Sequence, residues 1–256
     1  MIHESAIIDP SAIIGENVTI GPWTIIGGDV QIGNDTVIES HVVIKGPSKI
    51  GKSNHIYQYS SIGEDCQDKK YNGEPTELVI GDNNIFRECV TIHRGTIQDN
   101  SITVIGSDNL FMAYVHVAHD CIIGDHNILA NNASVAGHVH LGDWCILGGF
   151  VCVHQFCHIG SHSFCAVNTL VLKDIPPYVM ASGAKAQPFG LNTEGLKRRG
   201  FDADTVTAVK RAYKEVYRNG NTVSQAIEII KPAAQQYSQV QLFSDFIENS
   251  PRGIIR

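Results

Sequence analysis

The chain has few aromatic residues, few charged residues and no long apolar run. Of its 256 residues, 7% are aromatic and 18% are charged. No stretch approaches the roughly 20 apolar residues that a membrane-spanning helix needs. The first residues, Met1-Ile2-His3-Glu4, lack the basic start of a signal peptide. We therefore expect no integral membrane segment and a cytoplasmic location.

The sequence also lacks CxxC pairs and long basic runs. The seven cysteines are scattered, and we expect a reduced setting; four of them lie at or beside positions of an internal repeat and are expected to be small packing residues: Cys89, Cys121, Cys145 and Cys152. Without basic runs, nothing indicates nucleic-acid binding. From Tyr178 onward, eleven lysines and arginines stand against seven acidic residues, although the whole chain carries −7. A basic tail on an acidic body predicts an acidic partner near the tail, unless these charges are ordinary solvated helix faces.

An apolar residue recurs at every sixth position through most of the chain. There are 25 such positions: every sixth residue from Ile8 to Ile62, then Ile80, Phe86 and Ile92, then every sixth residue from Ile105 to Val171. With 43% apolar residues, chance would give this on the order of once in 10⁹. The hexapeptide period predicts a parallel β-helix in which three hexads close a coil of eighteen residues. Glycine often follows the apolar residue, for which we expect positive φ at tight corners.

The repeat ends near Ile175-Pro176-Pro177, so we expect a β-helix over residues 1–177 and an α-helical C-terminal domain over 178–256. Helical spacing predicts one helix over 201–217 with Asp202 as its N-cap. A second helix begins after Thr222 and is perturbed or ended near Pro232. A third short segment carries Val240, Phe243 and Phe246.

The six-residue period is interrupted twice, and both interruptions fall at one corner of the prism. About twelve residues, 66–77, are extruded between Ile62 and Ile80, and a shorter loop, near 96–102, lies between Ile92 and Ile105. Counting faces from Ile8 places Ile62 and Ile92 on the first face and both Ile80 and Ile105 on the second. Two loops that leave the same corner indicate a built site beside it.

Five of the twelve histidines lie on the first face beside that corner, over four consecutive coils. In coil register, one column holds His93, Ala118, Ala136 and His154, and the next holds Arg94, His119, Gly137 and Gln155; His116 and His138 lie beside them. Histidine suits general-base catalysis near neutral pH, and Asp120 could orient the ring of His119. The Gly137 N–H is a reasonable oxyanion donor. This arrangement fits acyl transfer.

Two other classes of protein remain open at this point. Histidines on stacked hexapeptide coils can bind zinc, as in γ-class carbonic anhydrases, with His116, His119, His138 and His140 as candidate ligands. The cations Lys69, Lys70 and Arg94 at the same edge disfavour a metal ion. The second of these classes is a non-catalytic scaffold, but the column of histidines argues against it.

Several runs beside these residues resemble the UDP-N-acetylglucosamine O-acyltransferases of lipid A biosynthesis. They are Gly73-Glu74-Pro75-Thr76, Thr91-Ile92-His93-Arg94-Gly95-Thr96, Ala118-His119-Asp120-Cys121, Ile128-Leu129-Ala130-Asn131-Asn132, Ala136-Gly137-His138, Val153-His154-Gln155-Phe156 and Gly195-Leu196-Lys197-Arg198-Arg199-Gly200-Phe201. The resemblance extends over nearly the whole chain. Hexapeptide repeats alone would be shared by many acetyltransferases, but these runs together are specific.

The resemblance implies an all-β left-handed parallel β-helix with a helical C-terminal domain, assembled as a homotrimer. It implies transfer of an (R)-3-hydroxyacyl chain from acyl carrier protein to the 3-hydroxyl of UDP-N-acetylglucosamine. His119 resembles the general base, Asp120 its partner and Gly137 the oxyanion donor. Residues implied to bind substrate are Asp68, Lys70, His93, His116, His138, His154, Gln155, Asn192, Glu194 and Arg198. No metal or organic cofactor is implied, since 4′-phosphopantetheine enters on the carrier protein.

The resemblance also points to an acyl-chain pocket C-terminal to the catalytic coil. Members that accept longer chains tend to have smaller residues in this stretch, which here includes Val167. We expect Val167 to form its wall and the preferred acyl chain to be of medium length. Whether the acceptor is the 3-hydroxyl sugar or a 3-amino analogue stays open.

Overall fold

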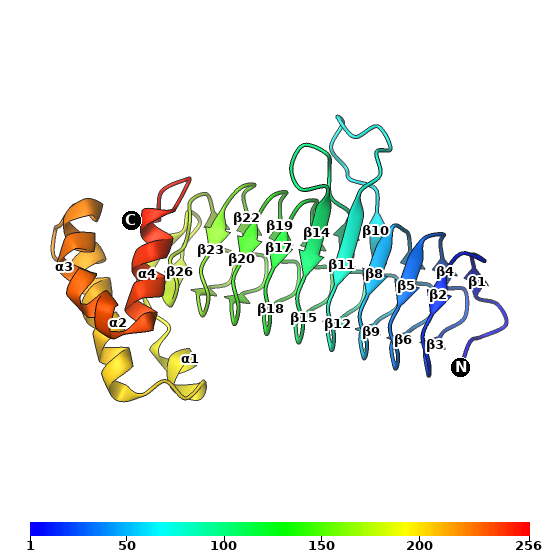
Figure 1. Ribbon diagram of the computed structural model, residues 1–256, viewed down its shortest axis with the longest axis horizontal. Coiled ribbons are helices and arrows are strands. Elements are labelled where there is room, and N and C mark those ends of the chain that lie inside the picture. The colour runs from blue at the N-terminus through cyan, green and yellow to red at the C-terminus, as the bar shows by residue number, and fades with distance from the viewer.

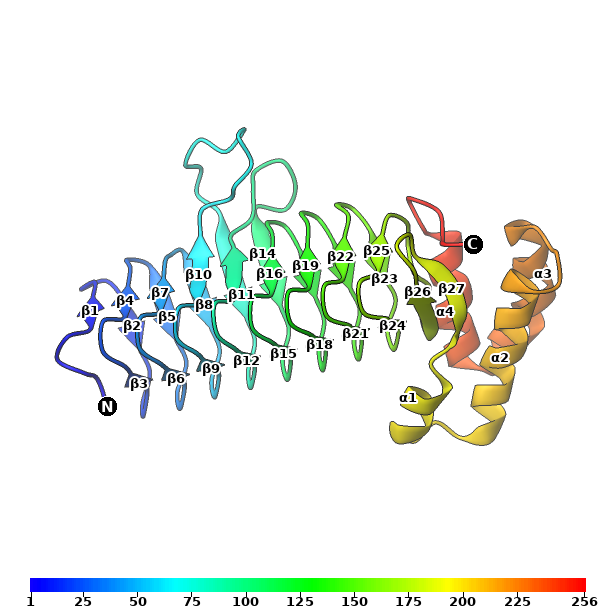
Figure 2. The ribbon, with the colours of Figure 1, turned by 180° about the vertical axis from the view of Figure 1, so that it is seen from behind.

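The computed structural model describes all 256 residues and forms an elongated three-sided prism with a bundle of helices at one end (Figure 1). The N-terminus lies at the opposite end of the prism from the helices (Figures 1 and 2). Three sheets form the sides, and each coil contributes one short strand to each side. Strands within a side are parallel, apart from the last one added to the third sheet. The predicted parallel β-helix is confirmed, whereas its left-handed winding stays a prediction.

The first sheet has nine strands: β1 (Ile7–Ile8), β4 (Ile25–Ile26), β7 (Val43–Ile44), β10 (Ser61–Glu64), β13 (Thr91–His93), β16 (His116–Val117), β19 (Ser134–Val135), β22 (Cys152–Val153) and β25 (Leu170–Val171). The second has eight: β2 (Ile13–Ile14), β5 (Val30–Ile32), β8 (Ser48–Ile50), β11 (Glu77–Ile80), β14 (Ile102–Ile105), β17 (Ile122–Ile123), β20 (His140–Leu141) and β23 (His158–Ile159).

The third sheet has ten strands: β3 (Thr19–Ile20), β6 (Val37–Ile38), β9 (His55–Ile56), β12 (Ile85–Phe86), β15 (Leu110–Phe111), β18 (Ile128–Leu129), β21 (Ile146–Leu147), β24 (Phe164–Cys165), β26 (Val179–Ser182) and β27 (Gln187–Leu191). Each apolar repeat residue pairs with its equivalent one coil away, as Ile26 does with Ile44. All 25 predicted core positions are buried except Ile8 and Ile14, which are half-buried at the open N-terminal end. Stacked coils therefore bury one another, as in other repeat proteins.

A second inward-facing column, two residues before each apolar repeat position, was not predicted. It is filled mainly by valine, cysteine, threonine, serine and asparagine, and part of it is a buried asparagine ladder. The side-chain oxygen of Asn84 accepts the backbone N–H of Asn109 at 2.9 Å, and Asn109 accepts that of Asn127 at 2.8 Å. The ladder gives partners to buried backbone N–H groups at one corner, which would otherwise destabilise the prism.

The predicted reason for glycine after the apolar residue holds at Gly63, which follows Ile62 and has φ 75°, but it is wrong for the other glycines of the repeat. Positive φ occurs instead three residues beyond the apolar position, mostly at non-glycine residues such as Asp120. Glycine is needed two residues before that position because the coils approach closely there. A Cβ on Gly33 would lie 2.5 Å from the carbonyl carbon of Gly51 in the next coil. Close approach of stacked backbones, rather than backbone conformation, explains these glycines.

Both insertions leave the same edge of the prism, as predicted. The first joins β10 to β11 and the second joins β13 to β14. Both run from the first sheet to the second, and they project side by side from the prism (Figures 1 and 2). The phase of the repeat thus located the two loops in space.

Four helices follow the prism: α1 (Thr193–Arg198), α2 (Ala203–Tyr217), α3 (Val223–Gln236) and α4 (Ser238–Glu248). Asp202 caps α2 and Thr222 caps α3, as predicted. Pro232 lies inside α3 without ending it. The short helix α1 was not predicted. None of the helices has the length and apolar character needed to cross a membrane.

The boundary predicted at residue 178 differs from the structure, because strands rather than helices come first. β26 continues the third sheet in parallel with β24, and β27 pairs with β26 in the antiparallel direction. This pair extends the third sheet at the C-terminal end of the prism, where an open sheet edge would otherwise expose unpaired backbone groups. The helical part begins only at Thr193.

Candidate active site

A cavity of about 380 Å³ opens on the first sheet beneath the first insertion. Its lining residues come from four consecutive coils and from that insertion: Gln67, Asp68, His93, His116, Ala118, His119, Ser134, Ala136, Gly137, Cys152 and Val153. The loop and the histidine column predicted to form a site therefore do meet. The cavity is open on one side.

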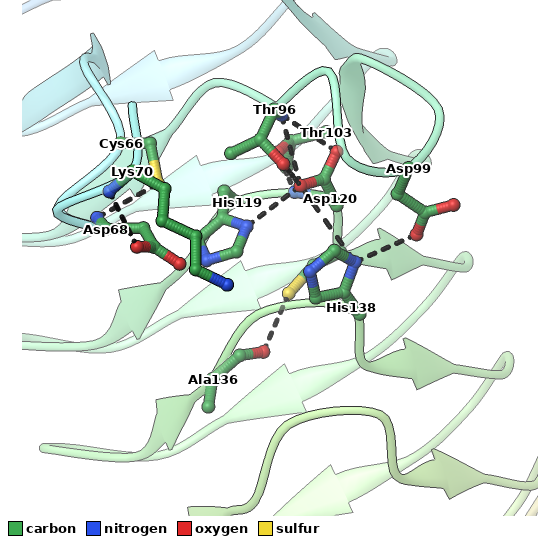
Figure 3. A network of polar contacts seen from close by, with 11 residues as sticks. Cys66, Asp68, Lys70, Thr96, Asp99, Thr103, His119, Asp120, Ala136 and His138 are labelled. Atoms are coloured by element: carbon green, nitrogen blue, oxygen red, sulfur yellow. Dashed lines mark hydrogen bonds and ion pairs between the residues drawn. The ribbon is translucent and has the colours of Figure 1, made fainter. Parts of the chain in front are cut away.

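His119 and Asp120 form a hydrogen-bonded pair at the edge of this cavity (Figure 3). His119 Nδ1 lies 2.8 Å from Asp120 Oδ2. Neighbours on a strand would point to opposite faces, but Asp120 has φ 57° and lies in the corner after β16. The left-handed conformation turns its carboxylate back to the preceding ring. The pair orients His119 with Nδ1 toward the carboxylate and leaves Nε2 for chemistry.

Asp120 is held by the second insertion and is itself fully buried. Thr96 donates to its carboxylate from the backbone N–H, at 2.9 and 3.0 Å, and from the hydroxyl, at 2.6 Å. The Thr103 hydroxyl accepts the backbone N–H of Asp120 at 2.8 Å. Burial alone would raise the pKa of the Asp120 carboxyl, but the hydrogen bonds from His119 and Thr96 outweigh it and hold that pKa below its usual value. Asp120 is thus ionised at neutral pH.

A second histidine–carboxylate pair lies next to the first. His138 Nδ1 is 2.8 Å from Asp99 Oδ2 in the second insertion and 3.9 Å from Asp120 Oδ2. The His119 and His138 rings meet edge to face with centroids 4.9 Å apart, and Figure 3 shows the two pairs together. On its other side the His138 ring stacks on Phe156. His138 is therefore in contact with both His119 and Phe156 and does not itself line the cavity.

Gly137 lies directly against the His119 ring. A Cβ added to Gly137 would lie 2.6 Å from both Cε1 and Nε2 of His119, so only glycine fits without moving the ring. The Gly137 N–H has no hydrogen-bond partner in the structure. At the neighbouring corner, equivalent amides are occupied, as Asp125 accepts the N–H of Ser107 and Asp143 that of Asp125. A free amide beside the histidine is what an oxyanion site requires.

His93 and His116 form the far wall of the cavity. His93 is only 3% exposed, and burial together with the neighbouring His116 lowers its pKa to about 4. Burial and His119 lower the pKa of His116, whose Nδ1 is 2.8 Å from the Thr91 hydroxyl. Both rings are neutral at pH 7 and present nitrogen atoms as hydrogen-bonding groups rather than as charges.

The predicted zinc ligands do not converge as a metal centre. Only one group of three potential ligands, His119, Asp120 and His138, has its atoms within 4.8 Å of one another. The Asp120 carboxylate already accepts Thr96, and Nδ1 of each histidine already faces a carboxylate. His140 instead stacks on His158 and lines a different cavity. The donors fit a hydrogen-bonded network better than a cation site.

Comparison with known proteins gives a consistent result over the whole chain. The chain matches two family models, one for the second domain of UDP-N-acetylglucosamine O-acyltransferase over residues 174–255 and one for the bacterial transferase hexapeptide over 11–46 and 102–137. It is 55% identical to the acyl-[acyl-carrier-protein]–UDP-N-acetylglucosamine O-acyltransferase of Stutzerimonas stutzeri (strain A1501), over 100% of this chain and 99% of that protein. The chain belongs to the UDP-N-acetylglucosamine O-acyltransferase family.

Solved structures of this family agree. The structure of LpxA from Acinetobacter baumannii is similar with a TM-score of 0.97 and 52% identity, covering 100% of this chain and 99% of that chain. The Francisella novicida UDP-N-acetylglucosamine acyltransferase is similar with a TM-score of 0.98 and 47% identity, covering 100% and 94%. The chain is therefore an acyltransferase, as its resemblance predicted, and neither a carbonic anhydrase nor a bare scaffold is supported.

Other site residues expected from the O-acyltransferase resemblance lie outside the cavity. Lys70 neighbours it, since its backbone N–H bonds to Asp68 Oδ1 at 3.0 Å. His154 and Gln155 are exposed one coil beyond Gly137. Asn192, Glu194 and Arg198 lie at or in α1, near the helical end and away from both insertions (Figure 2). Val167 is 68% exposed after β24, and its role in an acyl-chain pocket stays a prediction.

Several residues of this acyltransferase site were missed. Ser134 and Cys152 line the cavity and lie in register with His116 on the next two strands of the first sheet. A third column, begun at His116 and counted by coil in the sequence, would have found them. Cys152 is exposed, not a packing residue, unlike Cys121 and Cys145. Thr96 and Asp99 lie within an insertion, where the repeat assigns no register; Thr96 ends one of the runs that carry the resemblance, but nothing assigned it a role, and nothing in the sequence marked Asp99.

Proposed function

We propose that this acyltransferase transfers an (R)-3-hydroxyacyl chain from acyl carrier protein to the 3-hydroxyl of UDP-N-acetylglucosamine, the first step of lipid A biosynthesis. The observation that carries the proposal is the placement of the His119–Asp120 pair against the free Gly137 amide in one cavity. The printed names of full-length relatives, which describe this acyl donor and this acceptor, support it.

In the proposed mechanism His119 is the general base. Nε2 takes the proton of the sugar hydroxyl as its oxygen attacks the thioester carbonyl, and the imidazolium that forms is stabilised by Asp120 at 2.8 Å from Nδ1. The carbonyl carbon becomes tetrahedral and its oxygen becomes negative. Collapse of this intermediate expels the pantetheine thiolate, which receives the proton from His119. The ester forms, the thioester breaks, and the base is regenerated.

The Gly137 amide would stabilise the negative oxygen of that intermediate. Its N–H has no hydrogen-bond partner and Gly137 lies against the His119 ring, and a donor that is already oriented costs little reorganisation during the reaction. The protonated His119 would lie on the opposite side of the reacting carbon. One donor and one base, both fixed by the corner backbone, are sufficient for this step.

Substrate binding would need more than one chain. Asp68 and Lys70 would contact the sugar from the first insertion, and His93 and His116 would shape the cleft directly. His138 would shape it indirectly, by packing against the His119 ring. His154, Gln155, Asn192, Glu194 and Arg198 would bind the nucleotide. Because α1 lies away from the cavity of its own chain, we propose a homotrimer in which a neighbouring chain supplies these last three residues. The planar guanidinium of Arg198 suits a diphosphate.

The acyl donor would approach the basic C-terminal part. Residues from Tyr178 onward carry more basic than acidic side chains, which suits an acidic carrier protein in the cytoplasm. The reaction as proposed needs no metal or organic cofactor, because the thioester is already activated and the pantetheine arm arrives on the carrier. Activity that survives chelation, with no bound metal detected, is the expected result.

The direct test is product formation. The enzyme is incubated with UDP-N-acetylglucosamine and (R)-3-hydroxyacyl carrier proteins of a range of chain lengths, and the 3-O-acyl product is measured by mass spectrometry. Parallel reactions with a 3-amino analogue separate O- from N-acylation. Transfer only to the amino analogue would replace the proposed acceptor, and transfer to neither would point to a different hexapeptide acyltransferase activity.

A further inference from the structure

Arg94 lies at the point where both insertions leave the prism, and it is 6% exposed. Its backbone N–H bonds to the Glu64 carbonyl at 3.1 Å, at the end of β10. Its guanidinium donates to the Gly63 carbonyl, to the Asp65 carboxylate and, at 3.2 Å, to the Tyr71 hydroxyl. A single buried side chain thus contacts the base and the middle of the first insertion.

Tyr71 extends these contacts to the far side of the insertion. Its hydroxyl donates to the Glu74 carbonyl at 3.1 Å and approaches Asp65 at 3.4 Å. Its own N–H bonds to the Asp68 carbonyl at 3.0 Å. Half of the residues in the loop are exposed, and only Cys66 and Thr76 are buried. Few apolar contacts therefore hold the loop, so its shape depends on the polar contacts made through Arg94.

The segment that Arg94 holds contributes one wall of the cavity. Gln67 and Asp68 line the cavity across from His119, and they lie in the chain between Asp65 and Tyr71. Arg94 itself does not line the cavity. Arg94 can therefore affect substrate binding only indirectly, through the position of this loop.

We propose that Arg94 is a positioning residue, clamping the first insertion so that Asp68 and Lys70 meet the acceptor. The assignment of these two residues to the acceptor rests on the proposed function, whereas the clamp itself rests on the contacts above. Arginine suits the role because its planar fork reaches a carbonyl, a carboxylate and a hydroxyl together. Lysine keeps the charge but offers a single ammonium centre, so it cannot reproduce this geometry.

The test compares Arg94→Lys and Tyr71→Phe with the wild-type enzyme. We expect Arg94→Lys to raise the KM for the sugar nucleotide by about tenfold and Tyr71→Phe by about threefold, since hydrogen bonds to a charged group are lost. The kcat should stay within about twofold and its pH profile should be unchanged, because His119 and Asp120 do not contact the clamp. Arg87→Met is the matched control, as Arg87 pairs with Glu88 and lies over Tyr57 away from both loops.

Limited trypsin digestion tests whether Arg94 holds the first insertion, independently of enzyme activity. Lys69 and Lys70 are exposed in the insertion, so cleavage there should be about tenfold faster in Arg94→Lys at an unchanged melting temperature. Unchanged cleavage in Arg94→Lys would refute the clamp, whatever the enzyme acylates. Faster cleavage with an unchanged KM, or a loss confined to kcat, would refute the positioning role. If the wild type failed to acylate the sugar nucleotide but the cleavage result held, the proposed function would fail and the clamp would stand.

Discussion

Substituting alanine for Gly137 tests how closely the catalytic ring depends on the glycine. The added Cβ would lie 2.6 Å from Cε1 and Nε2 of His119, whereas ordinary contact begins at 3.4 Å. The ring must therefore retreat by about 0.8 Å or rotate. Either motion disturbs the 2.8 Å contact between Nδ1 and Asp120. The backbone at 137 does not have positive φ, so alanine adds no conformational strain of its own.

A displacement of about 1 Å at a reacting group costs on the order of 100-fold in rate. We therefore expect Gly137→Ala to lower kcat about 100-fold while the melting temperature changes little. Steady-state kinetics with acyl carrier protein and sugar nucleotide, beside thermal unfolding, measure both. The matched control is Gly149→Ala at another corner of the same coil, after β21 of the third sheet, where the added Cβ meets only the Asn131 carbonyl at 3.4 Å. A Gly137→Ala enzyme with normal kcat would show that the ring position beside Gly137 is not the reactive one.

Two further predictions concern stability and specificity. His93 has a folded-state pKa of about 4, below the roughly 6.5 of an unfolded histidine, so the unfolded chain binds the proton first as pH falls and stability drops between these values. By linkage, the free energy of unfolding falls by about 2 kcal/mol per chain at pH 4.5. Thermal unfolding at pH 7 and at pH 4.5 should show a smaller loss of stability in acid for His93→Gln than for the wild type. An equal loss in the two proteins would contradict the low pKa of His93. Val167→Gly should shift acyl preference toward longer chains in a donor panel, and an unchanged preference would remove Val167 from the pocket wall.

The sequence predicted the prism well because its period is a direct consequence of stacking. Each coil can bury only residues that point inward, so apolar residues recur at the same place in every coil. The separation of Ile26 and Ile44 in the sequence is therefore one coil, and the two residues pair on neighbouring strands. The same arithmetic located the two loops at one corner and placed Gly137 one coil from His119. These predictions needed only the phase of the repeat.

Prediction failed where no period exists. Thr96 and Asp99 support the two histidines from within an insertion, and an irregular loop gives no register from which to infer such contacts. β27 reverses direction, so it could not be read from a parallel repeat. The glycine pattern that includes Gly33 was clear in the sequence, but its predicted cause was wrong except at Gly63. Close approach of the next coil and a left-handed turn both favour glycine, so the pattern alone does not distinguish them.

The most direct test of the account is the activity of His119→Gln in a folded enzyme. Glutamine keeps a polar side chain near Asp120 but cannot accept and return a proton at neutral pH. With (R)-3-hydroxyacyl carrier protein and UDP-N-acetylglucosamine, we predict that kcat/KM falls by at least about 100-fold. The oligomeric state and melting temperature should stay at wild-type values. Near-normal turnover in that variant would contradict the account, because the proton would then be taken by a group other than His119.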